Sequence, residues 1–251
     1  MRLPQGWIVP SWQAPAQVRA FVTTREGGVS EGEHGSLNLG LSSGDDPGRV
    51  AANRRAVRAH LPSDPRWLVQ VHGTAVADLD RAGQAERPVA DAAVTSAAGC
   101  VAVVLTADCL PVFLSRRDGG RVAVAHAGWR GLAAGVLECA AAALDCPGDD
   151  AVAWLGPAIG PAAFEVGAEV RGAFLSADSA AAAAFVPRGE GKFLADLYAL
   201  ARQRLARAGV RRVSGGGFCT FTERERFYSY RREKASGRMG AFIWIDARRL
   251  S

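Results

Sequence analysis

Three short segments of this 251-residue chain each end on a side chain that can bind a transition metal. The apolar runs Trp67–His72 and Arg121–His126 predict buried strands that close on a histidine, and the run Val101–Cys109 closes on a cysteine. Two imidazoles and one thiolate suit Zn²⁺ with one coordination position left open, as in catalytic zinc sites. The pattern therefore predicts His72, Cys109 and His126 as metal ligands.

No local motif imposes this interpretation. The chain has only four histidines and five cysteines, and it contains no CxxC, HxxxH or HExxH sequence. In the alternative interpretation, the two histidines cap strands and bond to the backbone, while Cys109 is a small core residue. The sequence alone leaves both interpretations open.

The composition is that of an ordinary globular protein, with 49% hydrophobic and 22% charged residues. No stretch reads as an interdomain linker, so we expect one domain over residues 1–251. The net charge of +5 comes mainly from scattered arginines, because only Lys192 and Lys234 are lysines. There is no basic stripe with interleaved aromatic residues, so we expect no nucleic-acid partner.

The first residues lack the apolar run of a signal peptide, and no apolar run approaches the length of a membrane span. Five cysteines are an odd number without a framework spacing. We therefore expect a cytoplasmic protein with free thiols and no membrane partner. The oligomeric state stays open.

Hydrophobic periodicity and capping residues predict an α+β fold with mixed β-sheets and flanking helices. The elements do not alternate regularly as in a doubly wound sheet. The expected strands are 18–25, 67–72, 92–96, 100–106, 121–125, 151–155, 227–230 and 241–245. The expected helices are 47–60, 131–144, 168–175 and 195–208, with residues 176–184 as a mobile or helical surface segment.

The chemistry-bearing motifs resemble those of the YfiH-like family, and the resemblance covers nearly the whole chain in the family's order. The most specific are Gln70-Val71-His72-Gly73, Thr106-Ala107-Asp108-Cys109-Leu110-Pro111 and His126-Ala127-Gly128-Trp129-Arg130-Gly131. Further matches are Thr24-Arg25-Glu26-Gly27-Gly28-Val29-Ser30, Ser36-Leu37-Asn38-Leu39-Gly40, Phe227-Tyr228-Ser229-Tyr230-Arg231-Arg232 and Ser236-Gly237-Arg238. Members often carry a cysteine where this chain has Ala162 and Ala163, so that turn is not expected to bind metal.

The resemblance implies a YfiH-like fold and a metal, Zn²⁺ or Cu²⁺, held by His72, Cys109 and His126. It also implies a purine nucleoside phosphorylase that acts on adenosine, inosine and methylthioadenosine and has adenosine deaminase activity. Other family labels are laccase-domain or multicopper polyphenol oxidase and peptidoglycan editing factor. The expected small molecules are a nucleoside and phosphate.

Phosphorolysis requires cations that bind phosphate and a group that assists the departing purine. Arginine suits phosphate because its planar fork binds two oxygens at once. The expected substrate-binding residues are Arg25, which precedes the glycine-rich loop 26–35, and Asn38, Gln70, Arg54, Arg130 and Arg231. We expect Asp91, at the start of a strand, to serve in acid–base catalysis or ribose binding. Together with Cys109 and His126 it completes the expected catalytic set.

Two other enzyme classes remain open. A Cys109 thiolate beside His126, with Asp91 or Asp108 orienting the imidazole, would suit a cysteine amidase acting on muramyl peptide precursors. A copper-dependent polyphenol oxidase is disfavoured, because four histidines cannot supply a multicopper cluster. A non-enzymatic metal protein would need a fourth ligand, and the sequence offers no convincing one.

Overall fold

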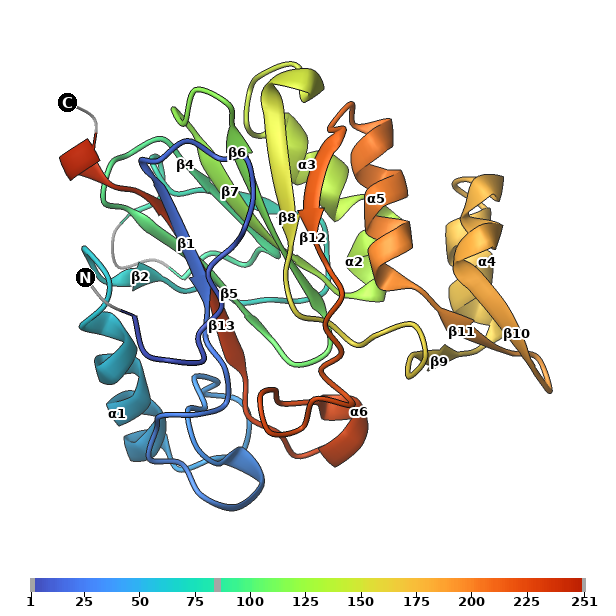
Figure 1. The fold of residues 1–251 in the computed structure, drawn as a ribbon, viewed down its shortest axis with the longest axis horizontal. Coiled ribbons are helices and arrows are strands. Elements are labelled where there is room, and N and C mark those ends of the chain that lie inside the picture. The colour runs from blue at the N-terminus through green and yellow to red at the C-terminus, as the bar shows by residue number, and fades with distance from the viewer. Residues whose placement is uncertain (1–2, 84–86, 250–251) are drawn as a thin grey trace.

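The architecture is two packed β-sheets with helices on both outer faces, seen in a computed structural model that describes residues 3–83 and 87–249 (Figure 1). The larger sheet has the strand order β12-β8-β6-β7-β4-β3, and the smaller has the order β1-β13-β5-β2. A third sheet, of order β10-β11-β9, lies beside α4 at one side of the molecule. The predicted α+β class with mixed sheets and flanking helices is confirmed.

The six-stranded sheet mixes parallel and antiparallel pairs. Its strands are β3 (Val76–Asp78), β4 (Ala92–Thr95), β6 (Leu110–Arg116), β7 (Val122–Ala127), β8 (Ala151–Leu155) and β12 (Arg212–Gly215). The four-stranded sheet contains β1 (Val18–Val22), β2 (Pro65–Arg66), β5 (Val101–Thr106) and β13 (Met239–Ile245). The small sheet contains β9 (Glu165–Val166), β10 (Phe185–Gly189) and β11 (Lys192–Ala195).

The helices are α1 (Pro47–Arg58), α2 (Trp129–Ala134), α3 (Val136–Ala142), α4 (Ala168–Leu175), α5 (Leu197–Arg207) and α6 (Tyr230–Glu233). The helices α1, α2, α3 and α5 cover the faces that the two sheets do not bury against each other, and α4 packs on the small sheet. Short 3₁₀ turns lie at Gly32–His34, Gly148–Asp150, Ser179–Ala184 and Ala247–Arg249. No helix in the described ranges combines the length and the apolar character that a bilayer crossing requires.

Three layers of apolar side chains hold these elements together. Phe113, Val124 and Trp154 of the larger sheet pack against Val104 and Ile243 of the smaller one. The other face of the larger sheet buries the helices α2, α3 and α5. The outer face of the smaller sheet buries α1. The two packed sheets are therefore covered on both faces, which explains why their central strands, such as β5, β7, β8 and β13, are continuous apolar runs.

One end of this sandwich gathers the segments that carry the chemistry. The connection from β5 to β6, residues 107–109, crosses from the smaller sheet to the larger one. Leu110 at the start of β6 pairs with Ala127 at the end of β7, and Met239 at the start of β13 pairs with Thr106. Both sheets therefore place strand ends around Cys109.

The predicted strand 67–72 is wrong. Only Val69 forms a bridge, to Val89, and Val71 is 55% exposed. His72 has a φ of 60°, which a continuous strand cannot accommodate. The chain turns there because the Asp91 carboxylate accepts hydrogen bonds from three successive backbone N–H groups.

The predicted strand 227–230 is also wrong, because Ser229 caps the short helix α6 by accepting a bond from the N–H of Arg232. The predicted helix 131–144 is divided at Gly135 into α2 and α3. The strands β2, β3, β6 and β12 and the small sheet were not predicted. Pro111 at the second position concealed β6, and β12 lacks an apolar run.

Gly135 allows the division between α2 and α3. Its φ of 104° is accessible to glycine but strained for other residues, and its N–H bonds back to α2 carbonyls. We expect Gly135→Ala to lower the free energy of unfolding by about 1–2 kcal/mol in urea titrations.

The matched control is Gly172→Ala in α4. Gly172 has an ordinary helical φ and an exposed surface, with no atom near the position of an added Cβ. That change should stabilise the protein by about 0.5–1 kcal/mol. Equal effects at the two positions would contradict the role given to Gly135.

Candidate metal centre

The three predicted ligands come together at the end of the sandwich. Nitrogen atoms of His72 and His126 and the Sγ of Cys109 all lie within 4.8 Å of one another. His72 Nε2 is 3.8 Å from Cys109 Sγ, and the two imidazole rings meet edge to face with centroids 4.8 Å apart. His126 is buried and His72 is exposed, so the group is open to solvent on the His72 side.

Each ligand is positioned by a different element. His126 is the penultimate residue of β7, and Cys109 lies in the crossing between the two sheets. His72 lies in the turn where its own φ is positive. Gly128 lets these parts approach, because a Cβ there would be 2.7 Å from His72 Cδ2 and 3.0 Å from Cys109 Sγ.

Asp91 lies behind the ligands and is fully buried. Its carboxylate accepts bonds from the backbone N–H groups of Val71, His72 and Gly73 at 2.7–3.1 Å and from His126 Nδ1 at 2.8 Å. Burial acts to raise the pKa of Asp91, but these bonds outweigh burial and lower it. The carboxylate therefore fixes His126 with Nδ1 protonated and Nε2 available as a ligand.

Cys109 and His126 also favour each other's charged forms. Burial acts to raise the pKa of the Cys109 thiol, but the charge of His126 and hydrogen bonds from both histidines lower it to about 6. Burial acts to lower the pKa of His126, but the Cys109 charge and the Asp91 bond raise it to about 9. Without a metal, Cys109 is therefore a thiolate near neutral pH.

Asp108 holds the crossing segment from the other side. Its φ is 83°, and its carboxylate accepts bonds from Thr220 Oγ1 at 2.6 Å, Ser229 Oγ at 3.0 Å and Arg231 N at 2.7 Å. These bonds bring the start of α6 beside Cys109. Asp91, and not Asp108, contacts the imidazole of His126.

Two of the predicted substrate-binding arginines, Arg25 and Arg54, each use two or more guanidinium nitrogens to bind backbone carbonyls. Arg25 donates to Gly35 O at 2.8 and 3.0 Å and to Arg224 O at 3.0 Å, and lies 3.7 Å from Glu233. Arg54 donates twice to Leu39 O and lies over the Trp67 ring at 3.7 Å. Burial and the charge of Arg87 lower the pKa of Arg54 to about 10.

The two predicted amides are bonded within the protein. Asn38 is fully buried, and its side chain joins Ser43, Asp45, Gly40 and Arg238. Gln70 donates to Leu105 O at 2.9 Å and accepts from Leu105 N at 2.8 Å, which attaches the His72 segment to β5.

The remaining two predicted arginines are exposed. Arg130 lies over the ring of Trp129 at 4.5 Å. Arg231 donates from Nη1 to Glu165 O at 2.7 Å. The substrate-binding roles of all six residues stay predictions, and the structure adds what each side chain contacts.

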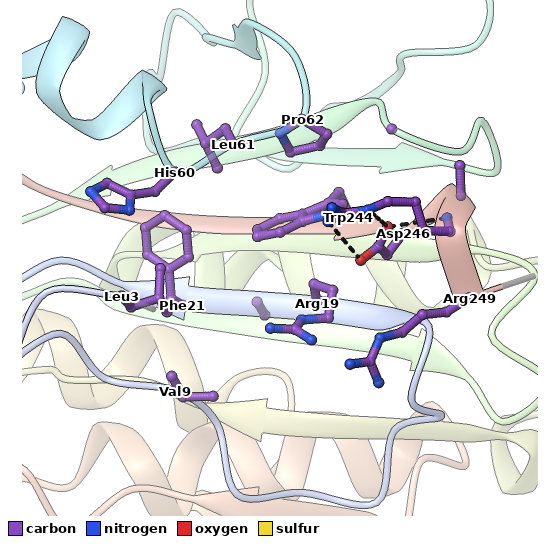
Figure 2. A pocket seen from close by; sticks show the side chains of 14 residues that line it. Leu3, Val9, Arg19, Phe21, His60, Leu61, Pro62, Trp244, Asp246 and Arg249 are labelled. Atoms are coloured by element: carbon purple, nitrogen blue, oxygen red, sulfur yellow. Dashed lines mark hydrogen bonds and ion pairs between the residues drawn. The ribbon is translucent and has the colours of Figure 1, made fainter. Parts of the chain in front are cut away.

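A groove of about 680 Å³ lies at the opposite end of the sandwich (Figure 2). Its floor includes Phe21 and Trp244, and Arg19 and Arg249 line its rim. Trp244 and Arg19 pair near the end of β13, whereas the metal-ligand group lies near its start. The groove is therefore separate from the His72–Cys109–His126 group.

Comparison with known proteins gave consistent matches over almost the whole chain. The family model described as "Multi-copper polyphenol oxidoreductase laccase" matches residues 19–246. A purine nucleoside phosphorylase of Pseudomonas aeruginosa is 52% identical over 242 residues, which are 96% of this chain and 99% of that protein. The purine nucleoside phosphorylase YfiH of Escherichia coli is 52% identical over 240 residues, covering 95% and 98% of the two chains.

A solved structure shows the same arrangement. The crystal structure of a Neisseria meningitidis protein superposes with a TM-score of 0.93 at 48% identity, covering 97% of this chain and 100% of that one. The similarity in fold therefore extends over almost the whole chain.

The ligand geometry predicts about one divalent metal ion per chain, measured by elemental analysis of protein purified without added metal. The Cys109→Ala, His126→Ala double variant should lose it, because two of three donors are gone. Cys139→Ala and Cys146→Ala should keep it, since these thiols lie outside the group. Full metal content in the double variant would falsify the site.

Proposed function

The chain belongs to the family of multi-copper polyphenol oxidoreductase laccases that includes YfiH, and we propose that it is a zinc-dependent purine nucleoside phosphorylase. The observation that carries this proposal is the His72–Cys109–His126 group in a chain 52% identical to proteins named purine nucleoside phosphorylase. The proposed substrates are adenosine, inosine and methylthioadenosine, with deamination of adenosine as a second activity. We propose the cytoplasm as its location, supported by five cysteines, an odd number without the spacing of a disulfide framework.

The donor set fits zinc. Two nitrogens and one sulfur are ligands that Zn²⁺ accepts, and the Asp91 bond to His126 is the outer-shell partner that such a histidine ordinarily has. Cu²⁺ would accept the same donors, so metal analysis decides between the two ions. When bound, the ion supplies a Lewis acid that polarises oxygen atoms and lowers the pKa of water.

In phosphorolysis a phosphate oxygen forms a bond to C1′ of the ribose, and the bond from C1′ to the purine nitrogen breaks. The purine leaves with the electron pair and then takes a proton. The protein must hold phosphate against its charge and keep the reacting atoms aligned. For Asp91 we propose a positioning role, because it is fully buried and its oxygens already accept four hydrogen bonds.

The laccase part of the family description suggests copper oxidation, but the histidines do not favour it here. All four lie among the described residues, and only His72 and His126 belong to a ligand group. His34 binds Ser43 O, and His60 lines the separate groove. A multicopper cluster needs more imidazoles than this end of the sandwich provides.

The proposal is tested with inosine and with adenosine, each with and without phosphate. We expect hypoxanthine release from inosine only when phosphate is present, and ammonia release from adenosine in either case. Chelation should stop both reactions and added Zn²⁺ should restore them. Undiminished phosphorolysis in metal-free protein would contradict the zinc mechanism, and no purine release under any condition would contradict the phosphorylase.

A second candidate function follows from the arrangement of Asp91, His126 and Cys109. In a cysteine amidase, such residues would be the carboxylate that orients the histidine, the base and the nucleophile, respectively. Alkylation separates it from the zinc enzyme. If Cys109 is a ligand, it should react slowly in metal-loaded protein and rapidly after stripping.

In stripped protein, the alkylation rate should rise with pH through about 6 and then level off, because the lowered pKa makes the thiolate complete at lower pH than in an ordinary thiol. Cys146, whose pKa burial raises, should react only at higher pH and serves as the internal control. Rapid alkylation of Cys109 in as-purified protein, with activity insensitive to chelation, would favour the amidase.

A further inference from the structure

Arg238 belongs to one of the family-like motifs but was not among the predicted substrate-binding residues, and it lies at the same end of the sandwich as the His72–Cys109–His126 group. Arg238 immediately precedes Met239, which pairs with Thr106 at the end of β5. Cys109 is three residues beyond Thr106 along the chain. Its guanidinium is 5.7 Å from the ring of Tyr230, in the segment that Asp108 bonds to the Cys109 loop. We propose that Arg238 is the residue that binds inorganic phosphate at this site.

The side chain of Arg238 is held in a fixed direction. Its Nη1 donates to Ser236 O at 2.6 Å and to Gly237 O at 3.0 Å. Its backbone N donates to Asn38 Oδ1 at 2.8 Å. Its stem lies against Gly40, where an added Cβ would be 2.7 Å from Arg238 Cγ. These contacts use one nitrogen of the guanidinium and orient the rest of the planar group.

Within the part of the chain that the structure describes, no carboxylate forms an ion pair with the guanidinium of Arg238. The ion pairs formed among residues 3–83 and 87–249 involve other arginines, such as Arg25 with Glu233 and Arg204 with Glu138. Burial lowers the pKa of Arg238, and the negative charges of Cys109 and Asp108 act in the opposite direction. A partly buried guanidinium without a counter-ion is favourable for binding an anion.

The other cations near the site are less suited to this role. Arg25 and Arg54 each use two or three nitrogens on backbone carbonyls. Arg231 directs Nη1 to Glu165 O, and Arg130 is exposed over Trp129. Arg238 differs from Arg25 and Arg54 because, among the described residues, only its Nη1 forms hydrogen bonds, which leaves Nε and Nη2 to bind an anion. It also stands where β13 begins, at the end of the sandwich that holds Cys109.

This inference rests on the proposed phosphorolysis, for which phosphate is the co-substrate. The free nitrogens of Arg238 would donate to phosphate oxygens while another oxygen attacks C1′. Arg238 forms no covalent bond in the reaction and transfers no proton. It binds phosphate and orients the attacking oxygen.

The test compares Arg238→Gln, Arg238→Lys and the control Arg19→Gln. Arg19 lines the groove at the far end of the sheet, so its loss removes the same charge away from the site. In Arg238→Gln we expect the KM for phosphate to rise about 10- to 100-fold, because a charge-assisted bidentate contact is lost. Arg238→Lys keeps the charge but not the fork, so its KM should be intermediate. Arg19→Gln should leave the KM for phosphate unchanged.

Metal content and melting temperature are measured on every variant, since Arg238 also bonds two carbonyls of its own loop. Phosphate binding to the zinc-loaded proteins is measured separately by calorimetry, with no nucleoside present. Wild-type protein should bind inorganic phosphate, and Arg238→Gln should lose that binding while retaining its zinc. If Arg238→Gln does not fold, Arg238→Lys carries the test: weaker phosphate binding at full zinc content supports the proposal, and unchanged binding overturns it.

The binding and activity results separate this inference from the phosphorylase itself. Phosphorolysis with an unchanged KM for phosphate in Arg238→Gln overturns the role of Arg238 and leaves the phosphorylase standing. Phosphate binding that depends on Arg238 in a protein without phosphorolysis keeps the anion site and rejects the phosphorylase. Loss of the phosphate-independent deamination in Arg238→Gln, at an unchanged KM for phosphate, also overturns the proposal.

Discussion

The buried carboxylate of Asp91 is the interaction on which the ligand-bearing end of the molecule depends. It accepts three backbone N–H groups from the turn that carries His72 and one from the ring of His126. One side chain therefore sets the position of one ligand and the tautomer of another. A buried carboxylate is stable only when it is fully hydrogen-bonded, so its own requirement for donors keeps the turn in place.

The packing of the two sheets gives this carboxylate its rigid surroundings. The chain crosses from one sheet to the other through residues 107–109, and Asp108 fixes the crossing by bonding Thr220, Ser229 and Arg231. His72 and Asp108 both have a positive φ, which costs conformational energy outside glycine. Two such residues beside the same ligand group, each held by several hydrogen bonds, indicate that the backbone there is adapted to position ligands.

The distribution of arginines shows how much of the positive charge serves structure. Arg25, Arg54 and Arg232 spend their donors on backbone carbonyls of irregular segments, whose oxygens have no strand or helix partner. This use explains why an arginine-rich chain need not be a polyanion-binding protein. It also explains why the number of arginines near a site says little about which one meets the substrate.

The sequence by itself pointed to His72, Cys109 and His126, which the structure brings together. It also predicted strands at 92–96, 100–106 and 121–125 and helices at 47–60 and 195–208 to within a few residues, because residue type and hydrophobic period are local properties. Tertiary structure alone decided that Trp67–His72 turns instead of pairing, and that Leu110–Arg116 is a central strand despite Pro111. It also decided which arginines face carbonyls and that Arg238 enters β13 at the end of the sandwich that holds Cys109. A strand forms only beside a second strand that accepts its hydrogen bonds, and the role of a side chain depends on the groups that it contacts. Both the second strand and the contacted groups come from residues distant in the sequence.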